Sequence, residues 1–214
     1  MKTLGPVWLA RHGETEWNRS GRMQGRKGAP LTDRGWGQAR ALAAAAVKLG
    51  VTRVVTSPLE RALVSATQVG AAVGCPLVLC DALMEADFGL CSGLTEPEIE
   101  QRFPGLLEER KREKWMHRWP EGESYADMVE RVAPALEMIA SEPRTMIVAH
   151  QSVNRVVSHL LADLSCEAAL AMAQPSDVIL AFESGSVRHS RIPSDGGDLD
   201  FTAGLYLGGV RRAN

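Results

Sequence analysis

Short apolar runs alternate with helical repeats along this chain, and this order limits the fold more than any other feature. The runs Pro6–Ala10, Arg53–Thr56, Pro76–Cys80 and Thr145–Ala149 have the length and composition of buried strands. Segments with apolar residues at helical spacing lie between them. Such alternation predicts a three-layer α/β/α fold, with a mostly parallel central sheet and helices on both faces.

No repeat, low-complexity tract or linker interrupts this order, so we expect one domain over residues 1–214. Residues 96–120 depart from the pattern because they are polar, highly charged and interrupted by prolines. We interpret them as short helices that form a small excursion, or lid, over the active site. Two later strands are expected at Val178–Phe182 and Ser186–Ile192, and Ser57 is expected to cap the helix after the second strand.

Chemically active side chains follow four of the predicted strands. Arg11 and His12 follow the first strand, Arg61 lies in the first turn after the second, Glu85 lies in the loop after the third, and His150 follows the fourth. Ligands of parallel α/β sheets bind beyond the carboxyl ends of the strands. The sequence therefore predicts that these five side chains meet at one edge of the sheet.

The residue types at this edge suit phosphoryl transfer. A neutral imidazole such as that of His12 is a good nucleophile, and a guanidinium such as that of Arg11 holds phosphate oxygens through paired hydrogen bonds. Gly13 is expected to let the backbone approach a ligand closely. Because neighbouring guanidinium groups disfavour the charged imidazole, we predict a lowered pKa for His12.

Composition excludes several other classes of protein. The formal net charge is 24 minus 26, or -2, which gives no reason to expect nucleic acid or an acidic membrane as a general partner. The apolar stretches are shorter than the ~20 residues that cross a bilayer, and residues 1–10 do not read as a signal peptide. The four cysteines show neither a CxxC pair nor zinc-type spacing, so a cytoplasmic location is expected.

Several motifs together resemble the histidine phosphatase superfamily, the phosphoglycerate mutase-like group, in its phosphatase branch. They are RHGETEWN followed by GRMQG, then PLTDRG, SPLERA, the acidic loop at Glu85 and the strand that ends in Ala149-His150. The tripeptide RHG alone recurs by chance, but the whole set covers nearly the entire chain and is specific.

The resemblance implies a role for each side chain at the predicted edge. His12 matches the nucleophile that forms a phosphohistidine, and Glu85 matches the general acid and base. Arg11, Arg61 and His150 match the groups that hold the phosphoryl oxygens. The mechanism that the resemblance implies needs no metal or organic cofactor, and no paired metal-ligand spacing joins His117, His159 and His189, so we expect neither.

The same resemblance implies further contacts and leaves some alternatives open. Asn18 and Gln24 match polar residues that line the phosphate pocket. Gln151 stands where the family usually has glycine, so that it either disturbs the local phosphate contact or adds a side-chain donor; the helix start beside it is expected to offer backbone N–H groups to the anion. Asp87 is a rival to Glu85, which is favoured because it begins an E-x-x-F-G pattern.

The charged segment before Glu123 is the least determined part of the expected site. As a bare charge run it is a solvated helix face. In the family this region covers the pocket, so Trp115, His117, Arg118 and Trp119 are candidates for substrate contact. Either Glu123 or Ser124, in the G-E-S stretch, is expected near the site.

The function implied is a histidine acid phosphatase-like, metal-independent phosphomonoester hydrolase that acts on a small phosphorylated metabolite. The alternative is a phosphoglycerate mutase-type transfer, which is disfavoured because the interval from Glu85 to Glu123 is short. A non-catalytic phospho-ligand module is the third reading. We expect a small phosphorylated substrate as the partner and leave a homodimer open.

Overall fold

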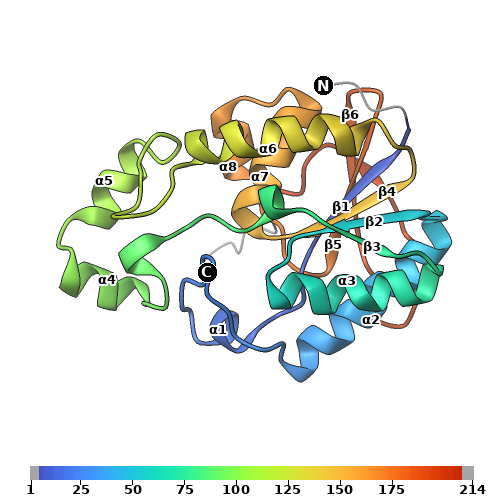
Figure 1. The fold of residues 1–214 in the computed structure, drawn as a ribbon, viewed down its shortest axis with the longest axis horizontal. Helices are drawn as coiled ribbons and strands as arrows, with labels where there is room; N and C mark the ends of the chain where they lie inside the picture. Colours follow the sequence, from blue (N-terminus) through green and yellow to red (C-terminus); the bar gives the residue numbers. More distant parts are fainter. Residues whose placement is uncertain (1–4, 209–214) are drawn as a thin grey trace, which may run out of the picture.

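One mixed sheet organises the computed structural model, which describes residues 5–208 (Figure 1). Within these residues the strand order is β3-β2-β4-β1-β5-β6-β7. Strands β3, β2, β4 and β1 pair in parallel, and β5, β6 and β7 extend the sheet in antiparallel fashion. The strands are β1 (Val7–Arg11), β2 (Arg53–Thr56), β3 (Leu77–Leu79), β4 (Thr145–Ala149), β5 (Val178–Glu183), β6 (Ser186–Arg191) and β7 (Thr202–Ala203).

Helices cover both faces of this sheet, as the alternating pattern predicts. In Figure 1, α2 and α3 lie on one side of the strands, and α6, α7 and α8 lie on the other. Strand β1 shows how the sequence serves both layers: Trp8 and Ala10 pack with α2 and α3, whereas Val7 and Leu9 pack with α6 and α7. The helices are α1 (Glu16–Arg19), α2 (Asp33–Leu49), α3 (Glu60–Val73), α4 (Glu96–Arg102), α5 (Leu106–Arg112), α6 (Tyr125–Ala140), α7 (Gln151–Ala162) and α8 (Cys166–Ala171).

Local signals fix several element boundaries. The Thr32 side chain accepts the N–H of Gly35 at the start of α2, and Gly50 ends that helix with φ 67°. Ser124 and Asp127 form a capping box at the start of α6. The turn between β5 and β6 consists of Ser184 and Gly185, both with positive φ, which is the geometry of a two-residue hairpin.

The expected cap at Ser57 is wrong. Helix α3 begins at Glu60 with Leu59 as its N-cap, and no side chain caps it. The Ser57 hydroxyl accepts the N–H of Leu59 and faces His150 instead, because strand β4 lies beside it. Sequence reading also missed α1, α8 and β7, and two short 3-10 helices (Asp81–Leu83 and Gly89–Cys91) interrupt the segment expected as loop.

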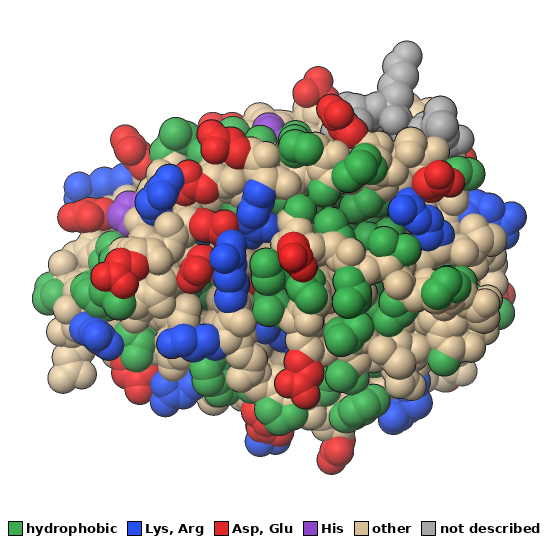
Figure 2. Space-filling model, viewed as in Figure 1, with side chains coloured by type: hydrophobic (Ala, Val, Ile, Leu, Met, Phe, Trp, Pro, Cys, Tyr) green, Lys and Arg blue, Asp and Glu red, His purple; other side chains and the backbone are tan. Residues whose placement is uncertain are grey.

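Helices α4 and α5 form the expected excursion and project beyond the sheet in Figure 1. Arg22 ties α4 to the central part of the molecule, because its guanidinium donates to both Glu98 carboxylate oxygens, at 2.8 and 3.2 Å. On the face drawn in Figure 2, basic and acidic side chains are interspersed over this region. No helix within residues 5–208 is long and apolar enough to cross a membrane.

Candidate active site

His12 lies immediately after β1 and is almost completely buried. Its Nδ1 is 2.7 Å from the carbonyl oxygen of Gly13, and the Nε of Arg61 lies 3.2 Å from its Nε2. A carbonyl only accepts and a guanidinium only donates, so Nδ1 carries the proton and Nε2 presents a lone pair. The ring is therefore held in the tautomer that a nucleophile at Nε2 requires.

The electrostatic surroundings keep this imidazole neutral. Burial lowers the pKa of His12 well below its usual range, and the charges of Arg11 and Arg61 lower it further. The direction agrees with the sequence expectation, but its main cause differs. The sequence prediction was based on the two arginines, whereas loss of solvent around the buried ring lowers the pKa of His12 more than they do.

Arg61, in the first turn of α3, holds the loop that closes over His12. Its Nη2 donates to the carbonyl of Gly25 at 2.7 Å and its Nη1 to the carbonyl of Lys27 at 2.8 Å. Burial lowers the pKa of Arg61 to about 10, against the raising effect of Glu85, so the group is charged at neutral pH. This guanidinium thus contacts Nε2 of His12 and the loop at once.

Arg11 approaches the same place from the last position of β1. Its Nη1 lies 3.4 Å from the carbonyl of Gln174, and its buried Nε has no hydrogen-bond partner among residues 5–208. Burial lowers its pKa, Glu85 raises it, and Arg155 lowers it again. Donor capacity on Arg11 is therefore available to an anion.

Glu85 reaches the start of α7 rather than leaving it open. Its carboxylate accepts N–H groups from Ser152 at 3.1 and 3.2 Å, from Val153 at 3.3 Å and from its own neighbour Ala86 at 2.9 Å. The helix dipole favours a negative charge there. These backbone N–H groups, which were expected to serve the substrate anion, are bound by Glu85 in the structure.

Of the two acidic residues in this loop, Glu85 faces the same cavity as His12. Asp87 instead accepts the N–H of Gly89 at 2.8 Å and lies 3.8 Å from Arg26, at a half-exposed position. The structure separates the two rivals by their surroundings. Only Glu85 borders the histidine.

A residue that sequence reasoning missed, Arg131 on α6, anchors the backbone around Glu85. Its guanidinium donates to the carbonyls of Ala82 at 2.6 Å, Met84 at 2.9 Å and Glu85 at 3.3 Å. The remaining donors go to the Glu123 carboxylate, at 3.0 and 3.1 Å. Arg131 therefore links three loop carbonyls to one carboxylate, and no local sequence signal indicates this.

Glu123 completes that anchor from the other side of the loop. One of its oxygens accepts the N–H of Asp87 at 2.9 Å, and the other lies 2.8 Å from the Nη2 of Arg26. Arg131, the Asp87 N–H and Arg26 together lower its pKa, against the effect of burial. Of the two residues expected near the site, Glu123 thus braces the Glu85 loop, whereas Ser124 caps α6.

His150 is the N-cap residue of α7 and has no exposed surface. Its ring lies 5.1 Å from the His12 ring, centroid to centroid, with the planes inclined at 57°. Burial lowers its pKa well below the usual range, and the nearby Arg61 lowers it further. The two imidazoles predicted from distant parts of the sequence are thus adjacent and neutral.

The cavity beside His12 has a volume of about 190 Å³. Other predicted residues line it, and His150 is in contact with one of them, His12, but is not itself part of the wall. The Asn18 side chain also accepts the N–H of Thr15, and the buried Gln24 Oε1 has no partner among residues 5–208. The predicted residues on its wall are Arg11, His12, Asn18, Gln24, Arg61, Glu85 and Gln151.

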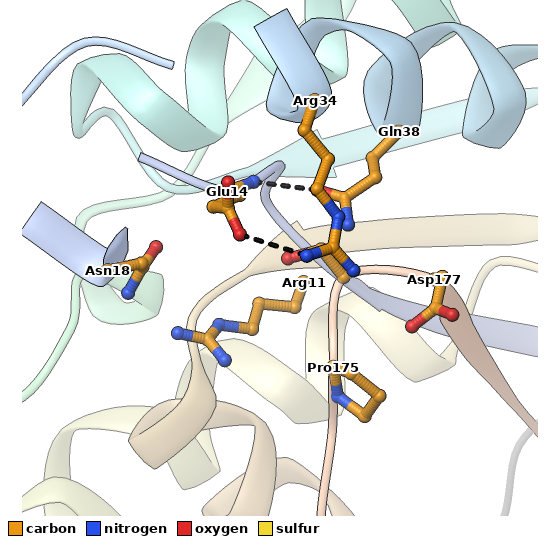
Figure 3. A pocket seen from close by; sticks show the side chains of 8 residues that line it. Arg11, Glu14, Asn18, Arg34, Gln38, Pro175 and Asp177 are labelled. Carbon is orange, nitrogen blue, oxygen red and sulfur yellow. Dashed lines mark hydrogen bonds and ion pairs between the residues drawn. The ribbon is translucent and has the colours of Figure 1, made fainter. Parts of the chain in front are cut away.

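A second cavity, of about 310 Å³, adjoins this one (Figure 3). Arg11 and Asn18 belong to the walls of both cavities, and Figure 3 shows the Arg11 guanidinium directed toward Asn18. On the opposite side Arg34 is paired with Glu14, at 3.3 Å. Positive charge in this second cavity is therefore partly neutralised.

The four aromatic and basic residues proposed for substrate contact do not line the cavity beside His12. Trp119 is buried against Phe88, and Trp115 stacks on Tyr125. Arg118 is paired with Asp127. In the excursion it is instead Arg110 and Lys114 whose pKa values fall through burial, together with nearby positive charge.

Gly13 was expected to let the backbone approach a ligand, but its small size is required by close packing against Gly35. A Cβ there would lie 2.3 Å from the Gly35 carbonyl oxygen, and a Cβ at Gly35 would lie 2.0 Å from the Glu14 carbonyl oxygen. The two glycines allow the first turn of α2 to touch the loop that carries His12. Among residues 5–208 no group of three or more His, Cys, Asp or Glu is placed to hold a metal ion.

A neutral imidazole among guanidinium groups suits a ligand that is both anionic and electrophilic. The phosphoryl group is the common biological ligand with both properties. Its place beyond the carboxyl ends of parallel strands follows the rule for open α/β sheets. The fold and the site therefore define an α/β protein whose sheet-edge cavity is suited to a phosphoryl group.

The chain belongs to the histidine phosphatase superfamily (branch 1), because the model of that family matches residues 7–192. The 6-phosphofructo-2-kinase/fructose-2,6-bisphosphatase 1 of Homo sapiens is 34% identical over 163 residues, which are 75% of this chain and 33% of the relative. The Gallus gallus 6-phosphofructo-2-kinase/fructose-2,6-bisphosphatase is 32% identical over 161 residues, with 75% and 33% covered. The chain spans about a third of the length of these relatives.

Solved structures show the same fold. The mycobacterial glucosyl-3-phosphoglycerate phosphatase in complex with VO3 is 25% identical with a TM-score of 0.70, over 95% of this chain and 98% of that chain. A protein described as mycobacterial hydrolase 2 is 26% identical with a TM-score of 0.74, over 95% of this chain and 90% of that one.

Proposed function

We propose that the protein hydrolyses phosphate monoesters of small metabolites through a phosphohistidine on His12. One observation carries the proposal: His12, which lines a cationic cavity, has its Nδ1 proton bound to the Gly13 carbonyl, so that its Nε2 is unprotonated and lies beside the Arg61 guanidinium. Membership of the superfamily supports the same chemistry. Positioning and charge stabilisation account for most of the catalysis in such transfers.

The proposed reaction has two steps. His12 Nε2 attacks phosphorus, the bond to the ester oxygen breaks, and the proton of the monoanionic ester passes through the Glu85 carboxyl to the leaving alcohol. Water then attacks the phosphohistidine while the Glu85 carboxylate takes the water proton, and inorganic phosphate leaves. Arg11, Arg61 and His150 hold the phosphoryl oxygens throughout.

We extend this proposal to an acid phosphatase-like enzyme that works without a metal ion. Arg61 is buried and Arg11 half-buried at the site, and their guanidinium charges supply what a cation supplies in other phosphoryl transfers. Treatment with EDTA is expected to leave kcat unchanged. The free state of Cys75, Cys80, Cys91 and Cys166 supports a reducing compartment such as the cytoplasm.

The substrate proposed carries a second anionic group. A cavity of about 350 Å³ shares Arg11 and Gln151 with the histidine cavity and is also lined by Arg155. Burial and the nearby charges of Arg155 and Arg110 lower the pKa of Lys114 to about 8, with only a weaker opposing effect from an acidic residue. Lys114 and Arg110 do not line this cavity, but the charges of Lys114, Arg110 and Arg155 repel one another, and an anion bound near Arg155 would reduce that repulsion.

The names of two relatives support this substrate class. One is a fructose-2,6-bisphosphatase, named for an ester with two phosphates, and the other is a glucosyl-3-phosphoglycerate phosphatase, named for an ester that also holds a carboxylate. For this chain we propose the shared chemistry, a phosphate ester with a second acidic group. The particular ester is left to measurement.

A phosphate-release assay tests the proposal. Fructose 2,6-bisphosphate, glucosyl-3-phosphoglycerate, 3-phosphoglycerate and p-nitrophenyl phosphate are compared by kcat/KM, with His12→Ala as the matched inactive variant. We expect phosphate release, and the highest kcat/KM with an ester that has a second anionic group. Formation of 2-phosphoglycerate without phosphate release would instead support the mutase, and binding of all esters without turnover would support a non-catalytic module.

A further inference from the structure

Ser57 has a role that its position in the sequence does not suggest. It lies just after β2, is completely buried, and does not cap α3. Its Oγ is 3.2 Å from the backbone nitrogen of Leu59 and 2.8 Å from Nε2 of His150. The hydroxyl therefore sits between a backbone donor and an imidazole of the site.

Accounting for protons determines which way this hydroxyl points. The N–H of Leu59 can only donate, so Ser57 Oγ accepts from it. The hydroxyl proton then needs an acceptor, and Nε2 of His150 is the one that residues 5–208 provide. Since buried hydroxyls are normally satisfied, Nε2 accepts, and a neutral His150 carries its proton on Nδ1.

The opposite nitrogen of the same ring is the unusual one. His150 Nδ1 is buried and has no hydrogen-bond partner among the described residues. Buried polar atoms without partners are rare and call for an explanation such as a ligand. The His150 ring also lies 5.1 Å from the ring that holds the attacking nitrogen of His12.

We propose that Ser57 is a positioning residue that holds His150 in the Nδ1–H tautomer, so that Nδ1–H donates to the phosphoryl group under attack. Both imidazoles are then in the Nδ1–H tautomer, but His12 offers its Nε2 to the phosphoryl group and His150 offers its Nδ1–H. His12 binds its proton to Gly13 and presents a lone pair, while His150 binds its lone pair to Ser57 and presents a proton. This inference rests on the proposed function for the identity of the acceptor.

Nitrogen NMR of the ¹⁵N-histidine-labelled full chain tests the tautomer without any need for turnover. In the wild-type protein we expect His150 Nε2 to resonate as an unprotonated nitrogen and Nδ1 as a protonated one. In Ser57→Ala the Nε2–H form is expected to become populated. Ser158→Ala is the matched control, because Ser158 is equally buried but its hydroxyl donates to Asn154 within α7.

Kinetics with p-nitrophenyl phosphate provide the second readout. Ser57→Ala is expected to lower kcat by up to about 10²-fold, the loss typical of one preorganised donor, with little change in KM. Ser57→Thr, which keeps a hydroxyl, is expected to restore both kcat and the tautomer. If Ser57→Ala does not fold, Ser57→Cys replaces it, because a thiol has similar volume but donates weakly.

The possible results distinguish a failure of the proposed role of Ser57 from a failure of the proposed hydrolase function. An Nδ1–H tautomer and a kcat that both persist in the folded Ser57→Ala or Ser57→Cys protein would overturn the role of Ser57. An Nε2–H tautomer in the wild-type protein would overturn it as well. A wild-type chain that has the expected tautomer but hydrolyses no ester would overturn the proposed function instead.

Discussion

The edge of the sheet and the excursion of α4 and α5 carry positive charge in different ways. At the sheet edge, His12, Arg61 and His150 are each buried and joined to backbone or to another side chain, and Glu85 provides the opposite charge. In the excursion, α4 and α5 carry five acidic and four basic side chains, and ion pairs such as Arg22–Glu98 and Lys111–Glu108 hold several of these charges at the surface.

The difference indicates a division of labour. Chemistry needs atoms held within a fraction of an ångström, and strand ends in a paired sheet provide that. Substrate choice needs a surface that differs between relatives, and short helices outside the sheet can vary without disturbing the core. Variants in the two regions should therefore affect different kinetic constants.

The largest effect is expected from His12→Ala. Without the nucleophile no phosphohistidine forms, and kcat should fall on the order of 10⁶-fold, as when other covalent nucleophiles are removed. Phosphate release from p-nitrophenyl phosphate measures this. His189→Ala on β6 is the control, since its ring binds the Gly204 carbonyl far along the sheet, and it should keep its activity. Equal activity in both variants would show that His12 at the sheet edge does not take part in the reaction.

Arg61→Gln should have the next largest effect. Loss of the guanidinium removes donors to the phosphoryl group and to the loop carbonyls of Gly25 and Lys27. We expect a loss of kcat of about 10²- to 10³-fold, or about 2.7–4 kcal/mol. The exposed Arg40→Gln on α2 should behave as the wild type, and a comparable loss there would point to a general charge effect.

Arg131→Met tests the anchor beneath Glu85. Three backbone carbonyls and Glu123 lose their partner, so the loop is expected to shift, and a displacement of about 1 Å can lower kcat on the order of 10²-fold. KM should change little, because Arg131 does not line the cavity. A rise in KM with an unchanged kcat would place Arg131 in substrate binding instead.

Arg110→Gln tests the other side of the comparison. If its guanidinium binds a second anionic group, kcat/KM for fructose 2,6-bisphosphate or glucosyl-3-phosphoglycerate should fall by about 10- to 10²-fold, the worth of a charged hydrogen bond. The value for p-nitrophenyl phosphate should not change. Lys111→Gln is the matched control, because Lys111 is exposed and pairs with Glu108. A parallel loss on all esters would contradict a role in substrate choice.

The smallest effect concerns stability against pH. The folded pKa values of His12 and His150 lie well below the unfolded value, so the unfolded chain binds more protons below about pH 6.5. Stability should therefore be full above that pH and fall by about 1.4 kcal/mol per pH unit for each imidazole as pH decreases. Urea unfolding at several pH values measures the slope, and His12→Gln should reduce it. A stability that increases on acidification would contradict the buried neutral pair.

Many of the strands and helices could be predicted from the sequence because the signals that define them are local. Strands β2 and β4 begin and end where their apolar runs do, and Thr32 and Ser124 cap α2 and α6, the helices that precede these strands. The rule that strand ends meet at one edge was enough to bring His12 and His150 together.

The unpredicted part consists of contacts between distant segments. Arg131 binds a loop more than forty residues away, and Ser57 meets His150 only because β2 and β4 are neighbours in the sheet. Gly13 needs its small size for Gly35, which lies on a different element. A motif names a residue but not the partner that orients it.

Trapping of the covalent intermediate tests the central claim most directly. The wild-type chain is mixed with a ³²P-labelled phosphate ester, quenched within milliseconds at alkaline pH, digested and mapped by mass spectrometry. We expect a phosphoryl group on Nε2 of His12, and none in His12→Ala. Label on His150, or phosphate release with no labelled histidine at any time, would contradict it.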